Sequence, residues 1–137
     1  MTRYRAEKIA GLKYGEVESF VRRHLLPSDL CRELTEREAF ALTVWAWLRL
    51  KLGTTSPSTS ILLFNMLTDK AAQLMRAAAN TYAASWHDSD GALNFIIAEL
   101  PAIFELLEAG HFDLRIFSLF RKATSARRRI AGIKELA

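Results

Sequence analysis

The chain has 137 residues, a formal net charge of +4 and a single cysteine, Cys31. Half of the residues are hydrophobic and a quarter are charged, a composition that excludes an intrinsically disordered chain and supplies apolar surface for a core. One cysteine cannot form a disulfide framework. The opening MTRYRAEK lacks a signal-peptide pattern, and no charge-free apolar run approaches about 18 residues. We therefore expect a cytoplasmic protein that does not enter a membrane.

The charge is distributed unevenly along the chain. Residues 1–53 carry ten Lys/Arg against seven Asp/Glu, residues 54–113 carry two against seven, and residues 114–137 carry seven against one. The three segments thus have net charges of +3, −5 and +6. Two basic segments around an acidic one suit a protein that binds a polyanion, although solvated charged faces would produce the same pattern.

Residues 5–26 carry the pattern of a helix-turn-helix unit. The first helix, within residues 1–14, ends at Gly11, because glycine readily adopts the left-handed conformation that terminates a helix. A second helix is predicted over residues 15–26 and stops before Pro27. Its apolar stripe has helical spacing: Val17, Phe20, Val21 and Leu25. In such a unit the second helix can enter the major groove of DNA. The acidic residues on this helix, Glu16 and Glu18, would oppose contact with phosphate.

A short segment and a long helix follow. Residues 27–34 are compatible with two brief strands that form a small wing, or with one helical turn. Thr35 and Glu38 form a capping-box pattern that starts a helix, which should run to Leu52 with Gly53 just beyond it. This helix is apolar almost all round, so we expect it to be buried on more than one side.

The second half of the chain reads as helical. Residues 53–60, GTTSPSTS, have the composition of a linker, and residues 61–86 show a helical stripe of small and apolar side chains. Residues 87–91 form a predicted turn with Asp90 as the N-cap of the next helix. That helix spans residues 93–107, and Pro101 should kink it. A short helix is predicted from residue 112 to its end at Arg121 and Lys122, and Ser125 is predicted to cap a last one.

These patterns predict an all-α, or nearly all-α, fold with a minimal wing. Residues 1–53 form the helix-turn-helix domain, residues 54–60 are a linker, and residues 61–137 form a helical bundle that also serves dimerisation.

The first sixty residues resemble the MerR-type winged helix-turn-helix family. The similarity rests on Lys8-Ile9-Ala10-Gly11-Leu12, on Val17 and Phe20, on Leu25-Leu26-Pro27, and on Leu34-Thr35-Glu36-Arg37-Glu38 with Leu42, Leu48 and Gly53. Excisionases share this type of domain, so the resemblance implies either a DNA-binding regulator or an architectural DNA-binding factor. The family has a basic residue near Glu18 and a glycine at His24.

Candidate DNA contacts follow from the charges of the unit. The residues that would meet DNA are Lys13, Tyr14, Ser19, Arg22, Arg23, Arg32 and Arg37. The basic ones mainly neutralise phosphate, whereas Ser19 and Lys13 are the best placed to meet base edges. A further run could act as a nucleic-acid tail or as an ordinary solvated face: Arg127, Arg128 and Arg129.

The apolar helices predict a surface for a second subunit or another protein. Its candidate residues are Trp45, Trp47, Leu67, Ala71, Leu74 and Ala78, and the stripe in residues 61–86 fits a bundle interior equally well. No metal site is expected, because Asp90 is explained as a cap and His87 and Asp88 have no second cluster. No nucleophile motif or phosphate loop is present, so neither a cofactor nor enzymatic activity is expected.

Two functions remain after this reading. The first is a DNA-binding transcriptional regulator or excisionase-like factor that binds duplex DNA through residues 5–26 and forms a homodimer. The second is a helical protein-interaction module, of a phage-type structural, adaptor or inhibitory kind, whose winged-helix fold no longer binds DNA.

Overall fold

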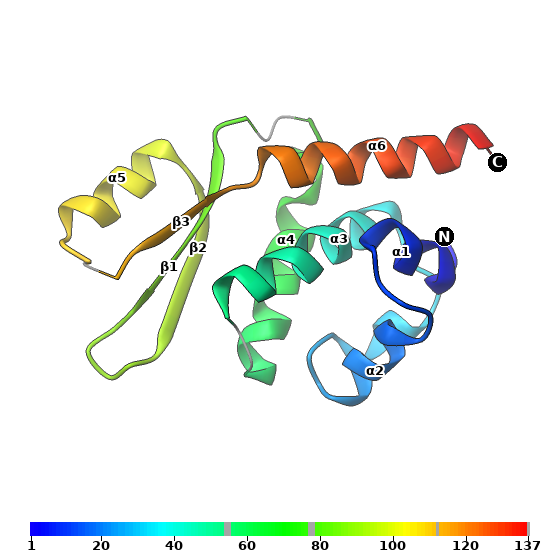
Figure 1. Ribbon diagram of the computed structural model, residues 1–137, viewed down its shortest axis with the longest axis horizontal. Helices are drawn as coiled ribbons and strands as arrows, with labels where there is room; N and C mark the ends of the chain where they lie inside the picture. Colours follow the sequence, from blue (N-terminus) through cyan, green and yellow to red (C-terminus); the bar gives the residue numbers. More distant parts are fainter. Residues whose placement is uncertain (54–55, 77–78, 112, 137) are drawn as a thin grey trace.

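The computed structural model describes residues 1–53, 56–76, 79–111 and 113–136 and is shown in Figure 1. Its helical elements are α1 (Arg3–Ala10), α2 (Glu16–Arg22), the 3₁₀ turn η1 (Ser28–Cys31), α3 (Glu36–Leu52), α4 (Pro57–Arg76), α5 (Leu100–Glu108) and α6 (Phe120–Leu136). The strands are β1 (Thr81–His87), β2 (Leu93–Glu99) and β3 (Arg115–Ser118). The helices α1 to α4 and α6 gather on one side of the molecule, and the sheet with α5 forms the other side.

The signals at the helix ends in the first half of the chain are confirmed. Gly11 and Gly53 terminate α1 and α3 in the left-handed conformation, with φ of 73° and 70°. Thr35 accepts a hydrogen bond from the backbone N–H of Glu38, and the Glu38 carboxylate accepts one from the N–H of Thr35. Both bonds of the predicted capping box are therefore present.

The helix α3 is the centre of the core, as its apolar sequence predicts. It is buried on most sides and packs against α1, α4 and α6. The fully buried Trp45 donates a hydrogen bond from Nε1 to the carbonyl of Ser60, 2.9 Å away, which joins α3 to the first turn of α4. Residues 57–60 of the predicted linker are thus part of a helix, and residues 54 and 55 lie outside the described part of the chain.

The predicted all-α fold is wrong, because the described residues contain a three-stranded antiparallel sheet in the order β2-β1-β3. The predicted helix over residues 61–86 ends at Arg76, and Thr81–His87 form the central strand. The alanines of this segment made it look helical. However, Thr81, Tyr82 and Trp86 are side chains that suit a pleated sheet, and the two neighbouring strands supply their hydrogen bonds.

The predicted helix over residues 93–107 is also wrong in its first half. β2 pairs with β1 from Thr81 opposite Glu99 to His87 opposite Leu93. The turn between the strands is organised by Asp88, whose Oδ1 accepts hydrogen bonds from the N–H groups of Asp90 and Ala92, so Asp90 is not a helix cap.

Pro101 does not kink a helix but lies in the first turn of α5, where proline's missing N–H costs little.

Strand pairing also changes the predicted boundaries of the last two helices. Residues 115–118 pair with β1, from Tyr82 opposite Ser118 to Ser85 opposite Arg115, instead of forming a helix. α6 then starts at Phe120 rather than at Ser125. Phe112, which the predicted short helix included, lies outside the described residues.

The sheet separates two layers. On one face, Ala83 and Ile97 belong to the same buried cluster as the core of the large helices. On the other face, α5 packs against β1 and β2. The large cluster runs from Ala6 in α1 to Ile130 in α6, because α6 returns to pack on α3 and α1. Residues 1–53 and 61–137 therefore share one core.

Candidate nucleic-acid interface

The turn between α1 and α2 is held by a buried carboxylate. Glu7 is only 1% exposed, and its Oε2 accepts a hydrogen bond from the backbone N–H of Val17, 3.0 Å away. Val17 lies in the first turn of α2, where N–H groups have no partner within their own helix. Glu7 thus fixes the start of α2 against α1.

The other end of α2 closes with a Schellman motif. The N–H of Leu25 donates to the carbonyl of Phe20 at 2.9 Å, and the N–H of His24 donates to that of Val21 at 3.0 Å. His24 has a φ of 60°, which makes it the one non-glycine residue with positive φ among those described. The chain needs a left-handed residue at the position where the resembled family has glycine, and a side chain there is strained. Leu25 and Leu26 then enter the core.

The two carboxylates of α2 are engaged within the chain. Glu16 Oε1 accepts a hydrogen bond from the N–H of Lys13 at 3.1 Å, and Glu18 lies 3.6 Å from the guanidinium of Arg3. Both interactions reduce the negative potential that α2 presents to solvent. The main electrostatic objection to phosphate near this helix is therefore weakened.

The basic candidates on α2 and its preceding turn reach solvent. Lys13, Arg22 and Arg23 are exposed, and Tyr14 is 79% exposed with its ring against Tyr4. Ser19 is only half-buried. We call the group of Lys13, Tyr14, Arg22 and Arg23 the α2 surface. Four of the predicted contacts thus lie on one short stretch of chain.

Arg49 is a basic residue beside this surface that the sequence analysis did not single out. Its guanidinium lies over the rings of Phe20 and Trp45, with centroid distances of 5.3 and 5.2 Å. Burial, and then the nearby charge of Arg23, lower the pKa of Arg49. The contact between Arg49 and Trp45 could have been predicted from the sequence, because residues four positions apart lie on the same side of a helix.

Arg32 and Arg37 are placed differently. Arg32 contacts the carboxylates of Asp29 at 3.6 Å and Glu38 at 3.4 Å, so its charge is balanced within the chain. Arg37 is exposed in the first turn of α3.

The predicted minimal wing is absent from residues 27–34. This stretch forms the turn η1 and no strand, because Leu30 and Leu34 anchor so short a segment to the core.

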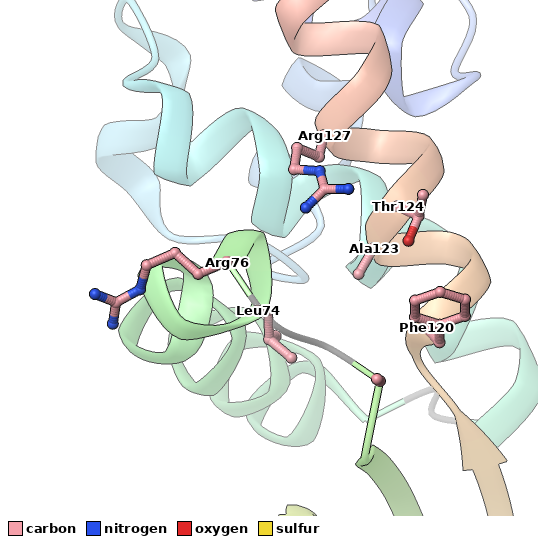
Figure 2. A pocket seen from close by; sticks show the side chains of 7 residues that line it. Leu74, Arg76, Phe120, Ala123, Thr124 and Arg127 are labelled. Carbon is pink, nitrogen blue, oxygen red and sulfur yellow. The ribbon is translucent and has the colours of Figure 1, made fainter.

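Two of the three arginines in the 127–129 run bind the ends of other helices. Arg129 donates to the carbonyl of Ile9 at 2.7 Å, and Arg127 donates to the carbonyl of Met75 at 3.2 Å. Both acceptors are next to the last residue of their helices, α1 and α4, where carbonyls lack partners and the helix dipole is negative. Figure 2 shows Arg127 extending from α6 towards α4, beside a pocket that Phe120, Thr124 and Leu74 help to line. Arg128 is exposed between them.

The predicted interface residues are mostly inside the chain. Trp45, Leu67, Ala71 and Leu74 are buried in the core, where they have no surface to offer a partner. Trp47 is half-buried, and Ala78 lies outside the described residues. The large apolar side chains that do reach solvent include Phe104 and Leu107 on α5, at 55% and 50% exposed.

The acidic and histidine residues of the hairpin do not gather into a metal site. His87 Nδ1 lies 2.8 Å from Asp113 Oδ2, while Asp88 is occupied by the turn. Within residues 1–53, 56–76, 79–111 and 113–136, no three His, Cys, Asp or Glu side chains are grouped so that they could hold a metal ion.

None of the helices that the structure describes is both long enough and apolar enough to span a bilayer. No family model matches the sequence, and a search of curated proteins finds no significant match.

Proposed function

We propose that the protein binds duplex DNA through the helix-turn-helix unit of residues 5–26, as a transcriptional regulator or an excisionase-like architectural factor. The observation that carries the proposal is the charge arrangement on α2. Arg22 and Arg23 are exposed at its end, while the carboxylates of Glu16 and Glu18 are held by the N–H of Lys13 and by Arg3. Positive groups are therefore free to replace the counterions of a phosphate backbone.

The construction of the unit supports the same proposal. Glu7 at one end of α2 and the Schellman motif at the other hold this seven-residue helix in a fixed position. A helix that is ordered before binding loses less conformational entropy when it docks. The resemblance of residues 1–60 to the MerR-type family points to the same surface.

The test is the salt dependence of binding to a random-sequence duplex. Replacing Arg22 and Arg23 by Glu should weaken binding at least roughly tenfold and reduce the salt slope by about 2, because two phosphate contacts are lost. Lys51→Glu combined with Arg115→Glu is the matched control, since both residues are exposed, lie outside the unit, and give the same change in net charge.

Circular dichroism of each variant checks the fold. Equal loss of binding in the control and in the Arg22/Arg23 variant would mean that net charge alone drives association. Unchanged binding in the Arg22/Arg23 variant would refute the proposed contact surface.

The second candidate, a protein-interaction module, is favoured by the exposed apolar side chains of α5, Phe104 and Leu107. These two side chains are three residues apart on α5 and therefore adjacent on its surface, and a contiguous apolar patch often marks a protein contact. A protein that uses this face and not α2 would show no salt-dependent retention on duplex DNA.

A further inference from the structure

The outer face of α6 carries a second basic surface. Arg121 and Arg128 are seven residues apart, which places them on the same side of the helix about 10 Å from each other along its axis. Thr124 and Ser125 lie between them. With Phe120 and Arg129 these four residues line an open depression of about 390 Å³. We call Arg121, Thr124, Ser125 and Arg128 the α6 surface.

The guanidinium groups of the α6 surface are exposed to solvent. Among the side chains that the structure describes, no carboxylate forms an ion pair with Arg121 or Arg128. Lys122 lies beside this surface on α6, and burial, followed by the charge of Arg129, lowers its pKa. Two guanidinium groups with hydroxyl donors between them form a set of donors that suits phosphate oxygens.

The α6 surface is held in a fixed orientation. Arg127 and Arg129, on the two sides of Arg128, are bonded to the ends of α4 and α1. These bonds and the buried side chains of Ala126 and Ile130 fix the rotation of α6 about its axis. Arg121 and Arg128 therefore stay on the outside of the helix.

The two basic surfaces lie on opposite sides of α3. α6 packs on α3, and Phe20 of α2 packs on the ring of Trp45 in the same helix, with a centroid distance of 5.2 Å. Figure 1 shows α6 along the upper edge of the view and α2 at the lower edge. Because α3 lies between the two surfaces, they face different directions, and one straight duplex docked on α2 does not also lie along α6.

We propose that the α6 surface is a second binding site for the phosphate backbone of duplex DNA, so that one chain bridges two DNA segments. This inference rests on the proposed function of the α2 surface. The α6 surface offers arginines and hydroxyls from one side of a helix, which contact backbone rather than base edges. It therefore adds affinity without sequence choice.

The experiment is a bridging assay with two duplexes. One duplex is immobilised and a second, labelled duplex of unrelated sequence is captured only when the protein binds both. The wild-type chain should capture the labelled duplex. Replacing Arg121 and Arg128 by Glu should reduce capture at least roughly tenfold while binding to a single duplex persists through α2. The control is again Lys51→Glu with Arg115→Glu, which should capture like the wild type.

The outcomes separate this inference from the proposed function. The bridging inference is overturned if the Arg121/Arg128 variant captures as much labelled duplex as the wild type does, or if the wild-type chain captures none. Either result leaves the α2 proposal standing. If the Arg22/Arg23 variant binds a single duplex normally while the Arg121/Arg128 variant does not, both the bridging inference and the assignment of α2 fail. A variant with Gln at positions 121 and 128 replaces the Glu variant if circular dichroism shows that the latter has lost helix.

Discussion

The three consecutive arginines of α6 should differ sharply in their effect on stability. Arg129 donates a 2.7 Å hydrogen bond to the carbonyl of Ile9, Arg127 a 3.2 Å bond to that of Met75, and Arg128 is exposed without such a contact among the described residues. Substitution of each by Met keeps most of the aliphatic stem and removes the guanidinium. The series therefore isolates the hydrogen bond from the packing.

The expected magnitudes follow from the geometry. At the end of α1 the N–H groups of Gly11 and Leu12 already serve the carbonyls of Lys8 and Glu7, and Arg129 serves that of Ile9. A hydrogen bond from a charged donor contributes about 1.5 to 3 kcal/mol. Loss of repulsion with Lys122 offsets part of this, so R129M should cost about 2 kcal/mol. R127M, whose bond is longer and exposed, should cost about 1 kcal/mol. R128M should stay within about 0.5 kcal/mol of the wild type.

Urea unfolding followed by circular dichroism measures the differences from midpoints at a common slope. For a chain of this size, about 2 kcal/mol corresponds to a fall in Tm of roughly 6 to 10 °C. Hydrogen exchange of the α1 amides should also quicken in R129M and not in R128M, because the end of α1 loses its cap. Equal midpoints for R129M and R128M would refute the structural role given to Arg129.

Three further outcomes are expected from the α1–α2 unit and the hairpin. His24→Gly should raise the free energy of unfolding by about 0.5 to 1 kcal/mol, because it removes the strain of a left-handed residue with a side chain. Urea unfolding measures this change, and a free energy of unfolding below that of the wild type would contradict the strain at His24. Glu7→Ala should lower it by about 1 to 3 kcal/mol, because the N–H of Val17 loses its buried acceptor; no change in thermal unfolding would contradict this. The N–H of Ala92 chiefly lowers the pKa of Asp88, and the hydrogen bond from His87 chiefly lowers that of Asp113. The hydrogen bonds to these two carboxylates therefore stabilise the fold at pH values above about 4, the ordinary pKa of Asp. This stabilisation is lost as the pH falls through the lowered pKa values of Asp88 and Asp113. Asp88→Asn with Asp113→Asn should therefore flatten the acid dependence of the hairpin's NMR signals.

The helix ends in the first half of the fold could be predicted because their signals are local. A capping box at Thr35 and Glu38, and glycines at positions 11 and 53, depend on residues within one turn of each other. The strands could not be predicted in the same way. β1 is stabilised by pairing with two other strands, β2 and β3, and β3 lies more than 25 residues further along the chain. The alanines of β1 also favour a helix when the segment is considered alone.

In the candidate interface, too, features that depend on local sequence could be predicted and features that depend on distant residues could not. The exposure of Arg22 and Arg23 follows from the stripe of α2, which the sequence shows directly. The partners of Arg127 and Arg129 lie 52 and 120 residues away, so no local pattern could distinguish them from Arg128. Likewise, only the folded chain shows that Arg32 faces the carboxylates of Asp29 and Glu38.

The bond between Arg129 and Ile9 has a consequence for how the molecule is made. The carbonyl of Ile9 in α1 gains the guanidinium of Arg129 only after residue 129 has been translated, and until then the apolar sides of α1 and α3 that α6 covers are exposed. A nascent chain that stops in the sheet would expose those sides to chaperones and proteases. Contacts of such long range also slow folding. The DNA-binding unit proposed here should become resistant to proteolysis only after the final helix has docked.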